Sequence, residues 1–388
     1  MVLTSSCSTP AGIHICYFTD SLEPSGVGVH LLNLMRWLDL ARLQVSLICP
    51  DTPDGRRLLV RAAQLGAQVH PWTVRDRRDQ ASISRLRRFL HDEKVTIFHS
   101  QVGISWEGML GLRTAYEAGV PVRLVTEHLP YLLTHPGQVA EHRRTTCLAD
   151  RVITVSEGSR RTFLDQGYPS EQFVCIHNGI EPPLQPPARE AAAVRRSIGV
   201  AEGAPLLLNV ARLTTQKGHE VLLEALPTVL TRYPQAYLAC VGEGPECERL
   251  RRYARALGIA GATHFLGRRD DVPALMGAAD LFVLSSRFEG HPLSVLEALG
   301  MGLPVVGTRV CGLEEAVVPG ETGLLVEPEQ PQQLAAAILE LLPDRERRVR
   351  MGEAGKRLVA ERFSARQMAH KTMELYEQLL REKLAPQT

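Results

Sequence analysis

Two basic side chains in the second half of the chain are placed where they could bind phosphate. Arg212 and Lys217 lie in the polar loop of NVARLTTQKGHEVLLEAL, between an apolar run that ends at Val210 and an amphipathic helix. Cations beyond the end of a strand and beside a helix N-terminus form a site for phosphate. A solvated Arg/Lys loop has the same pattern, so this segment alone leaves both interpretations open.

Two acidic side chains lie in the segment SSRFEGHPLSVLEALGMGLPVVGT. Glu289 follows the strand-like run LFVL, and Pro292 can take the first helical position. The free backbone N–H groups around Leu293 and Ser294 would then attract a diphosphate. Glu297, in the following helix, can accept hydrogen bonds from ribose hydroxyls, and Glu289 can reach a transferred sugar. A capping acid and a surface acid would not explain the apolar residues around Glu297.

Paired glycines occur in two further segments. YLACVGEGPECERL leads into Gly242, where the backbone can approach a ligand closely. The dinucleotide fingerprint G-x-G-x-x-G fails there because its last position is Cys247. The pair Gly26 and Gly28 fails the same comparison, since its last position is Leu31. A tight turn explains such glycine pairs as well as a ligand site does.

The elements that would position these residues alternate between short apolar runs and amphipathic helices. GIHICYFTD, QVSLICP and PVRLVTEH in the first half, and APLLLNVAR, DLFVLSS and LPVVGT in the second, are continuous apolar runs typical of strands covered on both faces. Strand–helix alternation predicts an α/β fold with parallel sheets and about six strands in each half. Ligands of such sheets bind beyond the carboxyl ends of the strands, which predicts two Rossmann-like domains facing a central cleft.

The best domain boundary is the proline-rich segment EPPLQPPARE at 181–190. We therefore expect an acceptor-binding domain over 1–185 and a donor-binding domain over 186–362. The remaining residues, 363–388, form a helix with Met368, Tyr376 and Leu379 near one side. This helix either crosses back over the two domains or is an ordinary docking helix.

Composition and charge exclude several classes of protein. The chain has 388 residues, 44% of them hydrophobic, which is globular composition and enough for two domains. Lys+Arg 44 against Asp+Glu 43 gives no overall attraction to nucleic acid. No signal peptide and no membrane-spanning apolar run are apparent, so we expect a cytoplasmic protein. Its Arg-rich stretch 75–88 is either a solvated helix face or a peripheral contact with anionic lipid at the inner face of the membrane.

The acidic segment resembles a known family of enzymes. EGHP at 289–292, EA at 297–298 and GLPVV at 302–306 are similar to the retaining GT-B glycosyltransferases of family 4, also called glycosyl transferases group 1. Further matching segments are VARL…QKG at 210–218, VGEGPE at 241–246, HFLGRRDDVPALMGAAD at 264–280, ETGLLVEP at 321–328, SGVGVHLLNL at 25–34, TEH at 126–128 and HNGI at 177–180. The similarity is densest from about 205 to 330.

The resemblance implies a role for each matching residue. Arg212 and Lys217 would neutralise the donor diphosphate, and Arg268 would border the base. A loop with Gly26 and Gly28 would close over the diphosphate and the acceptor. The expected catalytic residues are His128, near the anomeric carbon, with Glu289, Arg212 and Lys217. The expected donor-binding residues are Gly26, Gly28, Gly242, Arg268, Gly290, His291, Leu293, Ser294 and Glu297. For His128, a buried core histidine is the alternative.

The predicted function is transfer of a sugar, with retention of configuration, from a nucleotide-diphosphate donor to a glycan, lipid-linked or small-molecule acceptor. A UDP-sugar is the first expectation for the donor and a GDP-sugar the second. Because the chain has no Asp-x-Asp pair, we expect cations of the protein to replace a metal, and no cofactor. The alternatives are a sugar-nucleotide epimerase of the same fold and a non-catalytic nucleotide-sugar binding module.

Overall fold

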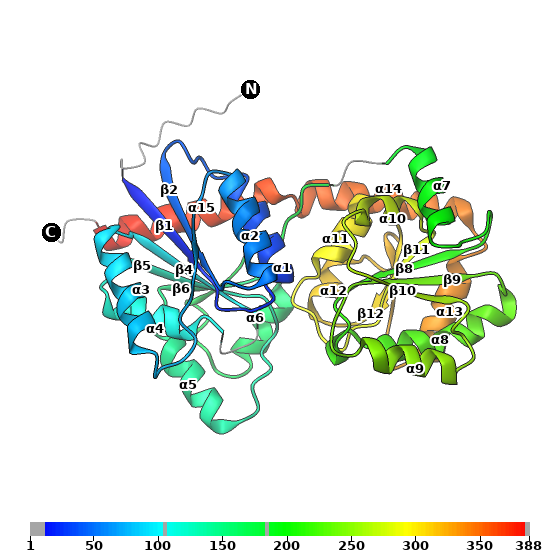
Figure 1. Cartoon of the computed structure of the whole chain (residues 1–388), viewed down its shortest axis with the longest axis horizontal. Coiled ribbons are helices and arrows are strands. Elements are labelled where there is room, and N and C mark those ends of the chain that lie inside the picture. Colours follow the sequence, from blue (N-terminus) through cyan, green and yellow to red (C-terminus); the bar gives the residue numbers. More distant parts are fainter. Residues whose placement is uncertain (1–11, 104–106, 183–185, 385–388) are drawn as a thin grey trace. The chain divides into compact units, whose positions relative to one another are not determined.

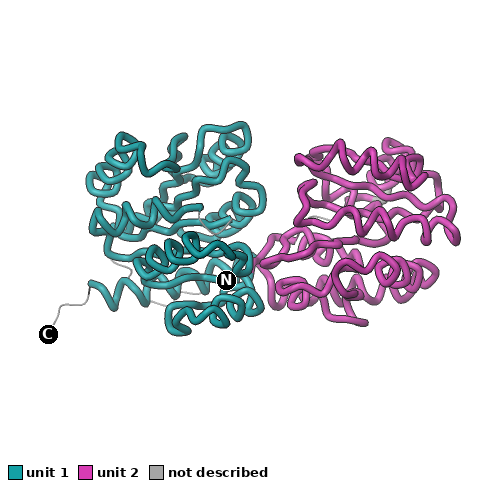
Figure 2. The backbone as a smooth tube through the Cα atoms, turned by 90° about the horizontal axis from the view of Figure 1, so that it is seen from below, with its two compact units in different colours: residues 1–177, 365–388 teal, residues 178–364 magenta. Residues whose placement is uncertain are grey.

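The structure is a computed structural model that describes residues 12–103, 107–182 and 186–384. The chain forms two compact units, shown in Figures 1 and 2: unit 1 is Met1–His177 with Ala365–Thr388, and unit 2 is Asn178–Ser364. The boundary expected at 185/186 thus lies at 177/178, and the one expected at 362/363 lies at 364/365. Pro183 of the predicted linker, and the first eleven residues considered for a signal peptide, lie outside the described residues.

Unit 1 contains a parallel sheet in the order β3-β2-β1-β4-β5-β6-β7. The strands are β1 (Ile13–Phe18), β2 (Leu43–Cys49), β3 (Gln68–Pro71), β4 (Ile97–Val102), β5 (Val122–Glu127), β6 (Arg151–Thr154) and β7 (Phe173–Cys175). The direction of strand order reverses between β1 and β4. That reversal is the switch point at which doubly wound sheets bind ligands.

Helices cover both faces of this sheet (Figure 1). They are α1 (Ser25–Met35), α2 (Pro53–Gln64), α3 (Gln80–Asp92), α4 (Met109–Glu117), α5 (Pro136–Thr146), α6 (Glu157–Leu164) and α15 (Ala365–Leu384). In β1, Ile15 and Tyr17 pack with α1, α2 and α15, whereas Cys16 and Phe18 pack with α3 and α4. Burial on both faces explains why this strand is apolar without a break.

The C-terminal helix α15 packs into the core of unit 1. The Tyr376 hydroxyl lies 2.5 Å from His99 Nδ1 and donates to the Tyr17 hydroxyl at 3.2 Å. Near the end of the helix, Lys383 Nζ lies 2.6 Å from Asp150 Oδ1. The chain therefore returns to unit 1 after unit 2, and α15 docks there.

Unit 2 repeats the same plan with the strand order β10-β9-β8-β11-β12-β13. Its strands are β8 (Leu206–Val210), β9 (Tyr237–Val241), β10 (Thr263–Gly267), β11 (Leu281–Leu284), β12 (Val305–Thr308) and β13 (Gly323–Val326). Its helices are α7 (Ala188–Ser197), α8 (His219–Arg232), α9 (Cys247–Ala256), α10 (Val272–Ala278), α11 (Leu293–Gly300), α12 (Cys311–Ala316), α13 (Pro331–Leu341) and α14 (Arg345–Arg362). The switch point lies between β8 and β11.

The structure confirms the predicted fold class and adds one strand to it. Unit 1 has seven strands rather than six, because the segment QVHP of β3 also pairs with β2. β3 lies at the sheet edge and its residues are exposed or half-buried. An edge strand needs no continuous apolar run and tolerates proline, so the apolar pattern used for the other strands is absent there. Among the described helices, none is long and apolar enough to cross a membrane.

We expect Tyr376→Ala to lower the free energy of unfolding of unit 1 by about 3–5 kcal/mol, because it removes a fully buried aromatic ring. Tyr376→Phe should cost about 1–3 kcal/mol, since His99 loses its buried partner. Denaturant unfolding followed by tryptophan fluorescence reports on unit 1, which contains Trp37, Trp72 and Trp106. An unchanged unfolding midpoint for Tyr376→Ala would contradict a core role for α15.

Candidate active site

Lys217 and Glu289 form an ion pair at the carboxyl end of the unit 2 sheet. Lys217 ends the short 3-10 helix η1 (Thr215–Lys217) that follows β8, and Glu289 lies between β11 and α11. The Lys217 Nζ is 2.5 Å from the Glu289 Oε1. Two residues 72 positions apart in the chain therefore meet at the switch point of the sheet.

The pair is largely withdrawn from water. The side chain of Glu289 is 5% exposed and that of Lys217 is 15% exposed. The Ser286 hydroxyl donates to the same Glu289 Oε1 at 2.6 Å, which adds a partner for the buried carboxylate. An ammonium group has three N–H donors, so Lys217 can bind Glu289 and still donate to a ligand.

Arg212 and Glu297 flank this pair in the chain but do not join it. Arg212 is half-buried just after β8, and Glu297 is half-buried in the second turn of α11. No hydrogen bond or ion pair of either side chain occurs among the residues that the structure describes. Burial raises the pKa of Glu297 to about 7. Its carboxyl group is therefore close to its titration point at neutral pH and available to a ligand.

The start of α11 differs from the expectation for Pro292. Pro292 is the N-cap residue, in an extended conformation with φ −72° and ψ 116°, and the helix begins at Leu293. Proline suits this cap position because its ring fixes φ near the observed value and leaves ψ free to be extended. Leu293 and Ser294 occupy the first two helical positions, whose N–H groups have no acceptor within a helix.

Gly290 and His291 are held by close contacts within unit 2. Asn178 Nδ2 donates to the His291 carbonyl at 2.8 Å, and the imidazole ring packs against Phe363 with centroids 4.9 Å apart. A Cβ on Gly312, in α12, would lie 1.7 Å from the Gly290 carbonyl oxygen. The backbone of this loop is therefore fixed by its neighbours, and His291 serves to pack the loop.

Gly242 and Arg268 lie in the loops after β9 and β10. Gly242 has φ 138°, and a Cβ there would be 2.0 Å from the Ala211 carbonyl oxygen. The fold therefore requires glycine at this position, whether or not a ligand binds. Arg268 is exposed after β10, the edge strand of the sheet.

His128 lies in unit 1, directly after β5. Its Nε2 is 2.9 Å from Gln101 Oε1, and its ring meets His30 edge-on with centroids 4.7 Å apart. Burial lowers the pKa of His128 well below its ordinary value, so the imidazole is neutral at neutral pH. The amide oxygen of Gln101 accepts a hydrogen bond from Nε2–H, so Nδ1 is the unprotonated nitrogen of the neutral ring.

Gly26 and Gly28 do not lie in a loop. Both belong to the first turns of α1, where the Gly28 N–H donates to the Pro24 carbonyl at 2.7 Å. Gly26 is exposed with open space at the position of a Cβ, and Gly28 faces Leu58 of α2. The expectation of a glycine loop was wrong because a pair of glycines does not by itself specify a loop, and here both are accommodated in the first turns of a helix.

A cavity of about 520 Å³ in unit 1 contains residues that sequence reasoning missed. Its charged and imidazole lining includes Asp20, Arg75, Arg77, Arg113, His135 and Glu141. Arg77 and Arg113 both pair with Glu141. Asp20 accepts a hydrogen bond from the Gly108 N–H at 2.7 Å, and burial raises its pKa to about 7. The signal for Asp20 was its place two residues after the end of β1, which is also the distance of Arg212 from the end of β8.

Groups of three or more His, Cys, Asp or Glu side chains that could hold a metal ion are absent from the described part of the chain. The nearest charged partners of Glu289 and Glu141 are lysine and arginine. Both carboxylate sites are thus balanced by cationic side chains of the protein.

Comparison with known proteins gives consistent matches over both halves. The model described as glycosyltransferase family 4 matches residues 24–183, and the model described as glycosyl transferases group 1 matches residues 191–358. A GDP-mannose-dependent alpha-(1-6)-phosphatidylinositol monomannoside mannosyltransferase of Mycolicibacterium smegmatis is 32% identical over 356 residues, 86% of this chain and 90% of that protein. The D-inositol 3-phosphate glycosyltransferase of Corynebacterium urealyticum is 34% identical over 59% of this chain, which spans 57% of that protein's length.

Solved structures show the same architecture. HepE of Anabaena in complex with UDP-glucose has a TM-score of 0.82 at 23% identity and covers 94% of this chain and 100% of that one. WaaG, a glycosyltransferase involved in lipopolysaccharide biosynthesis, has a TM-score of 0.69 at 16% identity, with 94% and 99% covered. At these identities the likeness concerns the fold. The two family models and the relative aligned over most of its length show that the chain is a glycosyltransferase of family 4, glycosyl transferases group 1. The solved structures show that it has the GT-B fold.

Proposed function

We propose that this glycosyltransferase takes a hexose from a nucleoside diphosphate donor bound in unit 2 and transfers it, with retention of anomeric configuration and without a metal ion, to a phosphorylated polyol or its lipid-linked form. The observation that carries the proposal is the buried Lys217–Glu289 pair at the switch point between β8 and β11. It supplies a cation for the diphosphate and a carboxylate for sugar hydroxyls at one place.

The leaving group explains the need for cations. Departure of a nucleoside diphosphate builds negative charge on the β-phosphate, and preorganised positive groups there lower the barrier. Lys217 is preorganised by Glu289, and Arg212 has no competing partner among the described residues. The N–H groups of Leu293 and Ser294 add the positive end of a helix. These groups would supply the charge that a divalent metal supplies elsewhere.

The donor base and sugar follow from relatives rather than from the site. The relative aligned over 90% of its own length is named as GDP-mannose-dependent, which moves our preference from a UDP-sugar to GDP-mannose. Glu297 is the proposed partner of the ribose hydroxyls because its carboxyl group has no other partner among the described residues. His128 of unit 1 has a neutral imidazole whose Nδ1 carries no proton, and it is the proposed acceptor of a hydroxyl proton.

The acceptor is assigned to the unit 1 cavity. Arginines suit a phosphate, and Asp20 and Glu141 suit hydroxyl groups, so the lining fits a polyol that carries an anionic group. The names of two relatives, which refer to D-inositol 3-phosphate and to phosphatidylinositol monomannoside, support this class. If the acceptor is lipid-linked, the exposed Arg85 and Arg88 of α3 would contact anionic headgroups.

We expect GDP-mannose to be consumed only when an acceptor such as D-inositol 3-phosphate or phosphatidylinositol vesicles is added, at the same rate in EDTA as in Mg²⁺. Product analysis by mass spectrometry and NMR measures the transfer and the anomeric configuration, with UDP-glucose as the second donor. An isomer formed from donor alone would favour an epimerase. Donor binding without turnover on either acceptor class would favour a binding module, and loss of activity in EDTA restored by Mg²⁺ would contradict metal independence.

We expect Lys217→Ala to lower kcat by about 10²–10³-fold, because it removes a preorganised charge at the leaving group. The matched control is Lys356→Ala on α14, which removes a half-buried lysine paired with Glu353 at 2.8 Å and should leave kcat unchanged. Steady-state kinetics with saturating acceptor measure both. Equal effects of the two substitutions would contradict the assignment of Lys217.

The raised pKa of Glu297 predicts a pH dependence of donor binding. Ribose hydroxyls donate to the ionised carboxylate, whose fraction rises from about one tenth at pH 6 to about nine tenths at pH 8 for a pKa of about 7. Donor KM should therefore fall about tenfold over this range, while both phosphates of a sugar nucleotide stay ionised. Without donor, the free energy of unfolding should fall as pH rises from about 4.5 to about 7, because over this range the carboxyl group ionises in the unfolded chain while the buried group stays protonated.

The control is Glu297→Gln, which cannot ionise. Its donor KM should exceed the wild-type value at pH 8 by about 10- to 100-fold and show no dependence on pH between 6 and 8. A wild-type donor KM that stays flat over this range would contradict the role of Glu297.

A further inference from the structure

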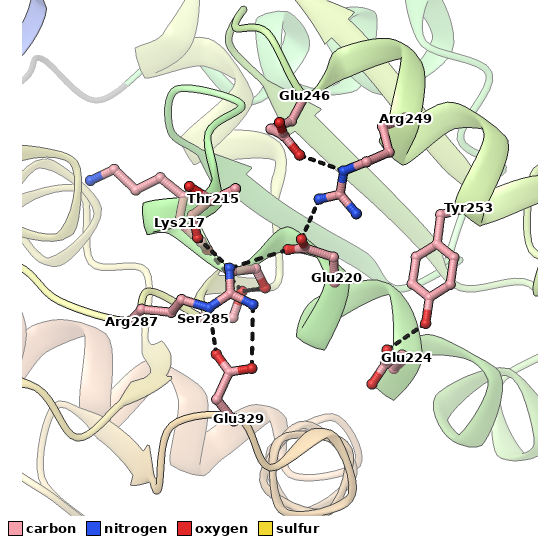
Figure 3. Close-up of polar contacts among 11 residues, drawn as sticks. Thr215, Lys217, Glu220, Glu224, Glu246, Arg249, Tyr253, Ser285, Arg287 and Glu329 are labelled. Carbon is pink, nitrogen blue, oxygen red and sulfur yellow. Dashed lines mark hydrogen bonds and ion pairs between the residues drawn. The ribbon is translucent and has the colours of Figure 1, made fainter.

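Arg287 lies two residues before Glu289, and its guanidinium makes a set of polar contacts of its own. Figure 3 shows its guanidinium between Thr215, Glu220 and Glu329. Nη1 donates to the Thr215 carbonyl at 2.5 Å. Nε and Nη2 donate to the two carboxylate oxygens of Glu329 at 2.8 and 3.3 Å, and Nη1 lies 3.8 Å from Glu220 Oε2. All five donors of an arginine fork are fixed in direction, so one residue can bind several elements at once.

The main contacts of this region join two loops. The Arg287 N–H donates to the Gln216 carbonyl at 2.8 Å, and Gln216 Nε2 donates to the Phe288 carbonyl at 3.1 Å. The Ser285 hydroxyl donates to the Gly218 carbonyl at 2.8 Å. Residues 215–218 and 285–288 are therefore paired along their length. Lys217 belongs to the first of these segments, and Glu289 directly follows the second.

One helix and one further strand-end loop also contact Arg287, through Glu220 and Glu329 respectively. Glu220, in the first turn of α8, also pairs with Arg249 of α9, which in turn pairs with Glu246 (Figure 3). Glu329, after β13, has φ 58°, a left-handed conformation that is rare for a residue other than glycine. Backbone strain of this kind persists where surrounding contacts require it. Here the strained residue presents both carboxylate oxygens to Arg287.

We propose that Arg287 is a positioning residue of the donor site, which holds the loop after β8 in register with the loop after β11 so that Lys217 meets Glu289 and the donor diphosphate. Among the described residues, the polar partners of the Arg287 guanidinium are carbonyl and carboxylate oxygens, so Arg287 acts on a donor through Lys217. The inference rests on the proposed function, because its effect is measured on donor use. Beyond that function, we infer that Arg287, which does not contact the donor, sets the position of the phosphate-binding Lys217.

The test is a double-mutant cycle. Arg287→Ala should raise donor KM and lower kcat, with a combined loss in kcat/KM of about tenfold or more, because a small displacement of a preorganised group is costly. In a Lys217→Ala background the same substitution should cost less than about twofold, since the residue through which it acts is already absent. Arg287→Lys keeps the charge but loses the fork, so it should recover little of the loss.

The matched control is Arg309→Ala. Arg309 is 41% exposed against 34% for Arg287, pairs with Glu327 at 3.1 Å and with Glu314 at 3.4 Å, and lies in the loop after β12. It should leave kcat/KM unchanged. An Arg287→Ala loss that matches Arg309→Ala, or that is fully additive with Lys217→Ala, would overturn the proposal.

The variant Glu329→Gly distinguishes an effect on the position of Arg287 from an effect on the stability of the protein. Glycine accepts the left-handed backbone of residue 329, so the thermal midpoint should not fall, while loss of the carboxylate frees Arg287 and raises donor KM. This variant decides the question if Arg287→Ala does not fold. Unchanged donor KM in a folded Glu329→Gly protein would overturn the proposal. Wild-type protein that neither binds nor uses a sugar nucleotide would instead contradict the proposed function itself.

Discussion

The 2.5 Å contact between Lys217 and Glu289 is the interaction on which the unit 2 site depends. Removing either partner would leave a charge in a position that water reaches poorly, and such a charge is costly unless a ligand replaces the partner. The pair therefore holds two loops together and keeps two charged groups in place for a ligand. Because an ammonium group has three N–H donors, Lys217 can keep its contact with Glu289 and still donate to the proposed diphosphate.

Parallel strand order creates this arrangement. β8 and β11 are neighbours although about 70 residues separate them, so the loops that follow them share one edge of the sheet. Arg287 pairs these loops, while Gly312 lets α12 approach the backbone at Gly290. The positions of the charged groups are set by backbone contacts before any ligand arrives, which is the condition for electrostatic stabilisation without reorganisation.

Each unit also holds a carboxyl group whose pKa is raised to near neutral pH by burial. Asp20 in unit 1 and Glu297 in unit 2 both have a pKa raised to about 7. Asp20 follows β1 and Glu297 belongs to the helix after β11, so both lie near the switch point of their own sheet. Buried carboxyl groups at such places are typical of functional sites, because folding stability alone gives no reason to keep them. The two units thus share a strand order and also a buried carboxyl group near the switch point of the sheet.

The sequence by itself determined the two α/β units, most of their strands, and the loops that carry Lys217 and Glu289. Apolar runs buried on both faces and a polar residue after each are local signals, readable within about ten residues. Only the tertiary structure decided that these two side chains meet and that Arg287 braces their loops. It also placed Gly26 in a helix, made Pro292 a cap, and added the edge strand β3. Those features depend on which segments become neighbours, and contacts between residues 72 positions apart leave no local pattern.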